Sequence, residues 1–579
     1  MTDTLRNSIV GLFINTISDG RFLPFPEQRL GWQLPANLQL ARAASSPPDS
    51  KVHETSESVS FQPTLARNDL EETISNRTSA NAFHSSINSY RKSLSSIEKA
   101  QVDLNMKPVH ETVSETIVNW YDEHDQENPQ NWSLGKRIFV LGLVSLLTFG
   151  VYIGSAIYTP SIPGIIEKFN VSKTIATLGL SLYIIGYGVG PLIFSPLSEI
   201  PSIGRTPVYM ATLLIFVLLQ LPIIYAPNIQ TLLAMRFFTG FFGSPALATG
   251  GASIQDMFPI IKLPYALIVW SVTASCGPIL GPIIGGFAAQ NRNWTWPLWE
   301  LFYIGVFAFI VLLFWLPETN AETILLKRAQ RLRKLTGNPN LFSKSEIKQS
   351  KLKPSEVLFE SLLRPFQLMI EPAVLYTNVY LGLTYAIFYL WFEAFPLVYG
   401  DIYHFNLGLS GLPFTGLLVT CILASSVYVC WNYYHVEPTF RKTGYIVPES
   451  RLAVALVASG FTYLFQIGWS SRPDVHWIVP TIGAALYIPG LFLLFQSVLV
   501  YLPSSYPIYA ASILAGNSLF RSTVAGCFQL FGTALYRKLT IGGGCSLLAG
   551  LSIALIPGLF IFYKYGGRLR ARSKYTVNV

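Results

Sequence analysis

The chain has 579 residues, of which 51% are hydrophobic and only 13% are charged, and its mean hydropathy is +0.40. A soluble domain carries about 25% charged residues, so this composition excludes general disorder and argues against a soluble enzyme. The formal charge of +9 comes from no compact basic segment, and we therefore expect no nucleic-acid partner. The remaining class is an all-α polytopic membrane protein, whose excess of Lys and Arg lies on the cytoplasmic side.

The first 137 residues differ in composition from the rest of the chain. Ser, Thr, Asn and Glu dominate from Ala44 to Glu115. Such a segment cannot bury enough apolar surface to fold by itself. We therefore predict that residues 1–137 form a cytoplasmic, largely disordered tail. Apolar residues at helical spacing within residues 5–30 allow a short amphipathic helix there.

From residue 138 onward, apolar runs recur that can cross a bilayer, which takes about 20 residues per helix. They predict twelve spans with one long polar and basic interruption at 317–370, which we assign as a cytoplasmic central loop. The membrane region therefore consists of two six-helix halves, 138–316 and 371–563, followed by a basic cytoplasmic tail at 564–579. In chain order the predicted spans are 138–158, 174–196, 207–225, 229–253, 264–289, 297–316, 371–395, 409–431, 452–470, 476–501, 507–533 and 541–563.

The positions of Lys and Arg predict the orientation. With a cytoplasmic N-terminus, most Lys and Arg residues outside the spans fall in cytoplasmic loops and tails. The even number of spans then places the C-terminus in the cytoplasm as well. Asn170 and Asn293 begin Asn-X-Ser/Thr sequons on the outer side, so we predict glycosylation at both. The central loop begins with an amphipathic helix near 316–337, suited either to the inner membrane face or to a solvated linker.

Ionisable side chains inside the spans are functional candidates, because burying a charge in a bilayer is costly. Arg236 lies in the fourth span and Arg521 in the eleventh. Each could serve transport or act as a hydrogen-bonded anchor between helices; we favour transport for Arg236 and, narrowly, the anchor for Arg521. Glu393 ends a one-face stripe of tyrosines in the seventh span, and a buried carboxylate there could take up and release a proton.

The chain has no sequence motif of an enzyme. It contains no zinc-protease, serine-hydrolase or phosphate-loop motif, and its five cysteines form no CxxC pair. We therefore expect no enzymatic activity, no metal and no cofactor. Any pumping would not be driven by ATP hydrolysis in this chain.

The fifth span contains the doubled pattern GPILGPIIGG at 277–286, in which small residues recur every four positions. Such spacing lets a neighbouring helix approach closely. The pattern resembles the antiporter motif of drug exporters in the major facilitator superfamily. The residues that carry this resemblance are Gly277, Pro278, Gly281, Pro282, Gly285 and Gly286.

Two further segments agree with this resemblance. The segment 190–209 resembles the superfamily's loop signature, which latches the two halves. MRFFTGFFGSPALATGGAS at 235–253 resembles the span-four signature, whose arginine, here Arg236, is assigned to proton coupling. The loop departs from the usual form by two extra residues and by Thr206 at a usually basic position, which leaves the charge partners open. The residues that match the loop signature are Gly190, Glu199, Gly204 and Arg205.

Over residues 128–575 the chain resembles the benomyl- and fluconazole-resistance exporters of the fungal twelve-spanner drug:proton antiporter family. This resemblance implies the major facilitator fold and alternating access at a central site. It also implies proton-coupled efflux of small amphiphilic drugs across the plasma membrane, with Arg236 tuning or relaying the proton. Glu393 is our candidate for the carboxylate that carries it. The proton gradient would supply the energy, without a cofactor.

The resemblance leaves the substrate open. The expected partners are azoles, benzimidazoles or a fungal metabolite, together with protons and the lipid bilayer, and we expect a monomer. Alternatives are an exporter of a self-made toxin or secondary metabolite, a polyamine or nutrient transporter of the same fold, and a receptor. The cavity should be large and mostly apolar, with aromatic walls. The candidate lining residues are Tyr152, Tyr158, Tyr183, Tyr187, Tyr385, Tyr389, Phe392, Asn517, Arg521 and Gln529.

Overall fold

The structure is a computed structural model, and most of its described chain is helical. It describes residues 2–18, 21–29, 32, 116–350, 354–444, 447–460, 468–506, 509–570, 573 and 575. The segment from Ala44 to Glu115, for which the composition predicts disorder, lies outside the described residues.

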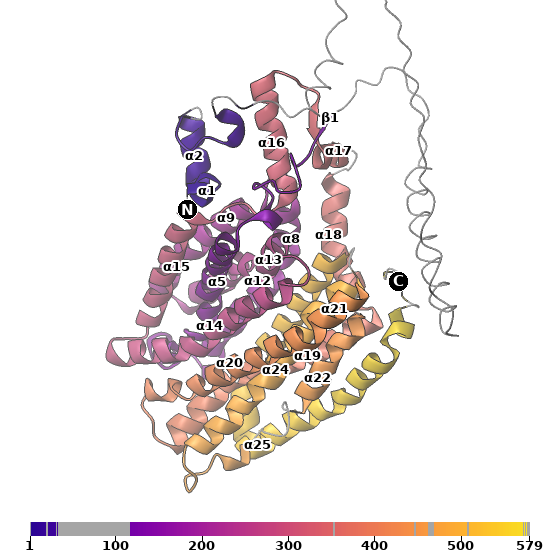
Figure 1. Ribbon diagram of the computed structural model, residues 1–579. Helices are drawn as coiled ribbons and strands as arrows, with labels where there is room; N and C mark the ends of the chain where they lie inside the picture. Colours follow the sequence, from indigo (N-terminus) through magenta and orange to yellow (C-terminus); the bar gives the residue numbers. More distant parts are fainter. Residues whose placement is uncertain are drawn as a thin grey trace, which may run out of the picture.

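Two groups of helices lie side by side and correspond to the two predicted halves (Figure 1). The first group comprises α5 (Leu134–Ala156), α6 (Ile162–Phe169), α7 (Lys173–Val189), α8 (Pro191–Glu199), α9 (Arg205–Leu218), α10 (Gln220–Ile224), α11 (Ile229–Gly243), α12 (Pro245–Ala248), α13 (Gly250–Met257), α14 (Leu263–Asn291) and α15 (Trp296–Trp315). The second comprises α19 (Pro372–Phe395), α20 (Phe414–Trp431), α21 (Glu437–Thr443), α22 (Leu452–Ser459), α24 (Ile478–Ser505) and α25 (Ala510–Arg570). The groups touch where α7 packs against α25 and where α14 packs against α20.

Nine helical segments among the described residues are long and apolar enough to cross a membrane, against twelve spans predicted from the sequence. The predicted fourth span is divided into α11, α12 and α13, so no single helix there is long enough. The ninth is described as α22 and a short turn at Gly468–Ser470, because residues 461–467 lie outside the described part. The eleventh and twelfth run together in α25, whose backbone turns at Thr540 with a φ of 64°. The twelve-span topology and the orientation stay predictions.

A small layer covers one end of the first half (Figure 1). We call it the cytoplasmic layer, after the orientation predicted from the charges. It contains α16 (Ala321–Thr336), α17 (Lys344–Ser350) and the parallel pair of β1 (Thr116–Val118) with β2 (Leu341–Ser343). The helix α18 (Pro354–Met369) follows and contacts both α8 and α25. The short helices α1 (Thr2–Arg6) and α2 (Ile9–Ile17) contact α15.

The apolar face of α16 packs against protein. Ala329 and Leu332 are buried against Val118 and Leu341. The expectation that this stripe meets the membrane or solvent is therefore corrected, because segments on both sides of the first half in the sequence cover it. The sequence could not show this pairing, since more than 200 residues separate the two strands.

An ion cluster joins α16 to the segments before the first span. Arg328 is fully buried. Its guanidinium contacts Asp125 at 2.7 Å, Glu127 at 2.8 Å and Glu27 at 3.6 Å. The Nη2 of Arg331 lies 3.3 Å from a carboxylate oxygen of Glu27 and 3.0 Å from one of Glu127. These five side chains, called the Arg328 cluster below, fix the cytoplasmic layer to the start of the membrane region.

Candidate functional site

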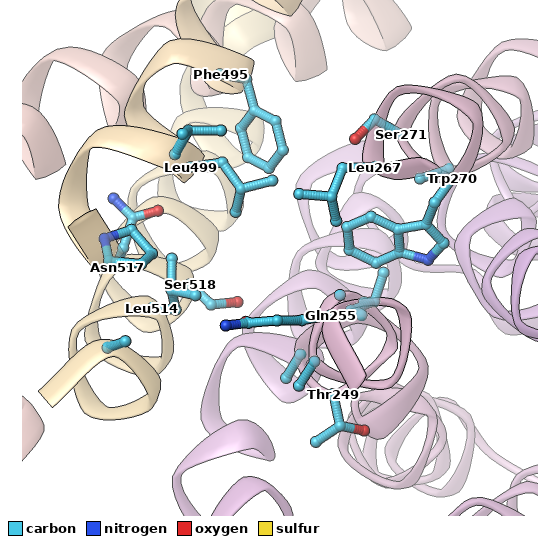
Figure 2. Close-up of a pocket in the computed structure, with 18 of the residues that line it drawn as sticks. Thr249, Gln255, Leu267, Trp270, Ser271, Phe495, Leu499, Leu514, Asn517 and Ser518 are labelled. Carbon is cyan, nitrogen blue, oxygen red and sulfur yellow. The ribbon is translucent and has the colours of Figure 1, made fainter. Parts of the chain in front are cut away.

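A cavity of about 820 Å³ lies between the two halves. Thr249, Gln255, Leu267, Trp270 and Ser271 of the first half face Phe495, Leu499, Leu514, Asn517 and Ser518 of the second across an open space (Figure 2). Its walls are mainly apolar with a few polar groups, and its volume suits a drug-sized molecule, for which pockets of roughly 300–1,000 Å³ are usual.

The cavity opens toward the cytoplasmic layer. Asn128, Gln130 and Ala321 belong to its lining, and all three lie beside the membrane end of that layer. The charged side chains Glu199, Arg205 and Asp256 line the same end. With the predicted orientation, this conformation is open to the cytoplasm.

Hydroxyl groups from both halves meet at the other end of the cavity. The hydroxyl of Tyr187 lies 2.8 Å from that of Tyr385 and donates to that of Tyr389 at 3.1 Å. The hydroxyl of Ser155 lies 3.2 Å from that of Tyr389. Ser155 and Tyr187 belong to the first half, whereas Tyr385 and Tyr389 lie on α19 of the second. These hydrogen bonds join the two halves at the end of the cavity away from the cytoplasmic layer. The four side chains are called the hydroxyl layer below.

One turn of α19 beyond Tyr389, Glu393 forms a second layer of closure. This carboxylate is almost completely buried. It pairs with the ammonium of Lys173 at 3.2 Å and accepts a hydrogen bond from Thr177 at 3.2 Å. The hydroxyl of Thr533 donates to its other oxygen. Lys173 and Thr177 lie on α7 of the first half, so these four side chains, called the outer seal below, close the cavity at the end away from the cytoplasmic layer.

Four of the ten predicted cavity residues line the cavity in this conformation: Tyr152, Tyr385, Asn517 and Arg521. The other six lie elsewhere. Tyr158 and Tyr183 flank Arg236, and Tyr187 and Tyr389 form the hydroxyl layer. Phe392 stacks on Phe414, with ring centroids 5.2 Å apart, and Gln529 donates to the backbone carbonyl of Tyr389. Helical periodicity predicted which face of each helix points into the protein. It could not predict which neighbouring side chain covers a given residue on that face.

Arg521 lies in the cavity wall on α25 and is 5% exposed. Its guanidinium carbon is 4.5 Å from the ring centroid of Tyr385 and 4.9 Å from that of Phe495. Among the described residues, no carboxylate lies within ion-pair distance of Arg521, and its Nε has no hydrogen-bond partner. One turn before it, Asn517 donates to Asn378 at 2.7 Å. The aromatic rings hold the cation in place without neutralising it.

Arg236 on α11 has a different environment. It is fully buried and does not line the cavity. Its Nε donates to the carbonyl oxygen of Gly179 at 3.2 Å, and its Nη2 donates to that of Gly154 at 2.9 Å. The rings of Tyr158 and Tyr183 lie against its guanidinium, whose carbon is 4.5 and 4.4 Å from their respective ring centroids. These contacts tie α11 to α5 and α7, which is the geometry of an anchor.

The glycine pattern of the fifth span packs α14 against α5. A side-chain carbon on Gly277 would lie 2.7 Å from the backbone nitrogen of Ile153, and one on Gly281 would lie 2.7 Å from that of Ile157. Gly285 meets the carbonyl of Ile157, whereas Gly286 faces Leu407 of the second half. The helix continues through Pro278 and Pro282, and Pro278 lines the cavity.

The loop signature lies at the cytoplasmic rim. Gly204 has a φ of 82° and allows the sharp entry into α9. The guanidinium of Arg205 pairs with Asp256 at 2.8 Å, while Glu318 accepts hydrogen bonds from the backbone N–H groups of Arg205 and Thr206, both at 3.2 Å. Gly190 packs closely against Ser244, and Glu199 lines the cavity rim. In this conformation none of the contacts named here reaches the second half.

Sequence reasoning missed Glu318 as a partner of the loop signature. A carboxylate at a helix N-terminus is favourable because it accepts from free N–H groups. Glu318 follows the sixth span directly, but more than 100 residues separate it from the helix that it caps. The only available signal was a carboxylate at the cytoplasmic end of a span.

Both sequon asparagines are exposed and lie in turns between helices. Asn170 ends α6 in the left-handed conformation, with a φ of 49°. Asn293 accepts a hydrogen bond from the backbone of Thr295 at 3.0 Å. Their exposure is compatible with glycosylation, which stays a prediction.

The comparisons with known proteins agree with the fold. The profile of the Major Facilitator Superfamily matches residues 144–528. Transporter mfs1 of Schizosaccharomyces pombe is 43% identical, over 79% of this chain and 88% of its own. A cycloheximide resistance protein of Candida maltosa is 40% identical, over 85% of this chain and 92% of its own. Fluconazole resistance protein 1 of Saccharomyces cerevisiae is 40% identical, over 79% of this chain and 85% of its own.

Among solved structures, the human organic anion transporter MFSD10 (TETRAN) is similar with a TM-score of 0.52 and 15% identity. The similarity covers 73% of this chain and 99% of the human one. At this identity the match supports the arrangement of helices and nothing about the cargo.

Proposed function

Because this chain belongs to the major facilitator superfamily, we propose that it is a multidrug exporter that moves small amphiphilic molecules out of the cell by alternating access. The observation that carries the proposal is the cavity of about 820 Å³ between the halves, open at one end and closed by the outer seal at the other. A molecule that enters from the cytoplasm would leave when the seal opens and the cytoplasmic ends approach.

The chemistry of the cavity supports substrates that are partly apolar. Trp270, Phe388, Phe492 and Phe495 belong to its lining, and aromatic walls adapt to ligands of different shape. The cycloheximide and fluconazole resistance proteins among the relatives support drugs as cargo. We propose azoles and benzimidazoles as the first classes to test. We also propose that the chain acts as a monomer in the plasma membrane.

We propose that export is coupled to proton entry, with Glu393 as the proton carrier. Its carboxylate bridges the two halves through Lys173, so a proton that neutralises it would weaken a contact that closes the outer end in this conformation. Coupling requires that the proton stabilise two states differently. Arg236 is the proposed second participant, tuning the proton step through the packing of α11 against α5 and α7.

The test is efflux from yeast that lack their own exporters. Cells expressing the chain are loaded with a neutral fluorescent amphiphile such as Nile red, and efflux is followed with and without a protonophore. We expect efflux that stops when the proton gradient collapses. Efflux that continues unchanged would reject proton coupling. Absence of efflux, with the protein present at the plasma membrane, would reject the proposed function.

A further inference from the structure

Arg521 is the one charged group in the described cavity lining that has no charged partner. The lining contains four charged side chains. Arg205 pairs with Asp256 at the cytoplasmic rim, where Glu199 also interacts with Arg205. Arg521 instead lies on the opposite wall, near the hydroxyl layer, with its guanidinium between Tyr385 and Phe495.

This arrangement leaves a buried cation with unused binding capacity. An arginine has five N–H donors in a planar fork that matches a carboxylate or another oxyanion. The Nε of Arg521 has no partner among the described residues, although the side chain is 95% buried, with only 5% exposed. A buried charge is normally paired, because desolvation without a partner is costly. The missing partner would lie in the cavity.

We propose that the cavity selects cargo by charge: amphiphiles that place an anionic oxygen, such as a carboxylate or phenolate, against Arg521 are preferred, neutral ones are accepted, and organic cations are disfavoured. This rests on the proposed export function and narrows its substrate class. An oxyanion would complete the coordination of the guanidinium while its apolar part lies against Phe495 and Leu499. A cation would meet a fixed like charge in a poorly solvated site, which costs binding energy. Polyamines are therefore unsuitable cargo.

The experiment uses dyes of related shape and different charge in the same yeast cells. Fluorescein is anionic, rhodamine 123 shares its xanthene core and is cationic, and Nile red is neutral. Efflux rates are normalised to the amount of full-length protein at the cell surface. We expect the wild-type chain to export fluorescein faster, and rhodamine 123 slower, than Nile red.

Variants then test whether Arg521 sets this order. In Arg521→Gln the ratio of fluorescein to Nile red efflux should fall about tenfold, the effect of losing ~1.4 kcal/mol of selective binding. Arg521→Lys keeps the charge and should retain most of the preference. Arg537→Gln makes the same change at an exposed position of α25 outside the cavity lining, and should leave the order of the three dyes unchanged.

The outcomes separate the two proposals. If Nile red is exported but its ratio to fluorescein is the same in wild type and Arg521→Gln, charge selection is rejected and export stands. A loss of preference in Arg521→Lys as large as in Arg521→Gln would also reject it, because shape rather than charge would then be responsible. If the wild-type chain exports none of the three dyes, the export function fails, and the selection fails with it.

Discussion

Arg236 and Arg521 are both buried arginines in predicted spans, but their surroundings differ. Both Arg236 and Arg521 lie in apolar helices. Arg236 donates to two backbone carbonyls and joins three helices of one half. Arg521 contacts two aromatic rings and lines the cavity. The contacts give Arg236 the geometry of an anchor and place Arg521 in the cavity wall, whereas from the sequence we favoured transport for Arg236 and, narrowly, the anchor for Arg521.

Substitutions of Arg236 test whether this residue only anchors the helices or also takes part in proton coupling. Arg236→Ala removes hydrogen bonds from a charged donor, each worth about 1.5–3 kcal/mol when buried. We expect the variant to reach the membrane with a lower Tm and to lose transport, whereas Arg236→Lys keeps partial transport. Tm is measured in detergent and efflux in cells. Normal efflux by Arg236→Ala would show that the residue is an anchor without a role in coupling.

The carboxylate of Glu393 should control the response to external pH. Glu393→Gln keeps a hydrogen-bonding side chain of similar size but can neither bind the proton nor pair with Lys173. We expect efflux that no longer changes between external pH 5 and pH 7.5. Glu300→Gln, which alters a half-buried carboxylate of α15 away from the outer seal, is the matched control and should respond like wild type. An unchanged profile in Glu393→Gln would remove Glu393 from the coupling scheme.

At the scale of the elements, close helix contact in the first half depends on residues without side chains. The helix α14 carries two internal prolines yet stays continuous, and its glycines bring it against the backbone of α5. Because Pro278 and Tyr152 of these two helices both line the cavity, their spacing also sets one cavity wall.

The smallest change that tests this contact is Gly277→Ala. The new methyl group would lie 2.7 Å from the nitrogen of Ile153 and 2.9 Å from the side chain of Tyr152, so the helices must separate. We expect a stability loss of about 1–3 kcal/mol, as for other overpacked sites, together with reduced efflux. Gly142→Ala on α5, where nothing lies within 4 Å, should change neither Tm nor efflux. Equal behaviour of the two variants would contradict the close-packing role.

We expect the Arg328 cluster to stabilise the cytoplasmic layer. Arg328→Ala would leave the carboxylates of Glu27, Asp125 and Glu127 buried with only Arg331 nearby. Breaking a buried ion pair in this way costs about 3–5 kcal/mol. We expect faster proteolysis near residues 116–133 and 321–343 in detergent. Arg333→Ala, on the same helix as Arg328, breaks a partly exposed pair with Glu346 of α17 and should change the cleavage rate little.

The pKa of Asp125 gives the pH range over which this cluster holds. Burial alone would raise that pKa, but hydrogen bonds from Arg328 and from backbone N–H groups outweigh it and lower it below its ordinary value. The unfolded chain therefore binds the proton more tightly, so the stabilisation is present above the unfolded pKa of about 3.9 and is lost as pH falls through the lower folded value. The layer should resist proteolysis equally from pH 5 to pH 8.

At the scale of the whole molecule, the structure is a conformation open at one end. A cysteine introduced at Ser518, in a chain whose own cysteines are replaced, should react faster with a membrane-impermeant thiol reagent in inside-out vesicles than in intact cells. Thr177→Cys should react slowly from either side, because the outer seal is closed in this conformation. Reaction of the Ser518 position in intact cells only would contradict the predicted orientation.

The sequence by itself determined the class of the molecule, its two halves and its family resemblance, because apolar run length, basic loops and the glycine–proline pattern of residues 277–286 are local properties. Only the tertiary structure decided which side chains meet. Tyr187 and Tyr389, more than 200 residues apart, close one end of the cavity, and Glu318 caps the helix that begins at Arg205. Arg521 lines the cavity and has no charged partner among the described residues. Periodicity gives each helix a face, whereas the packing of one half against the other determines what covers it.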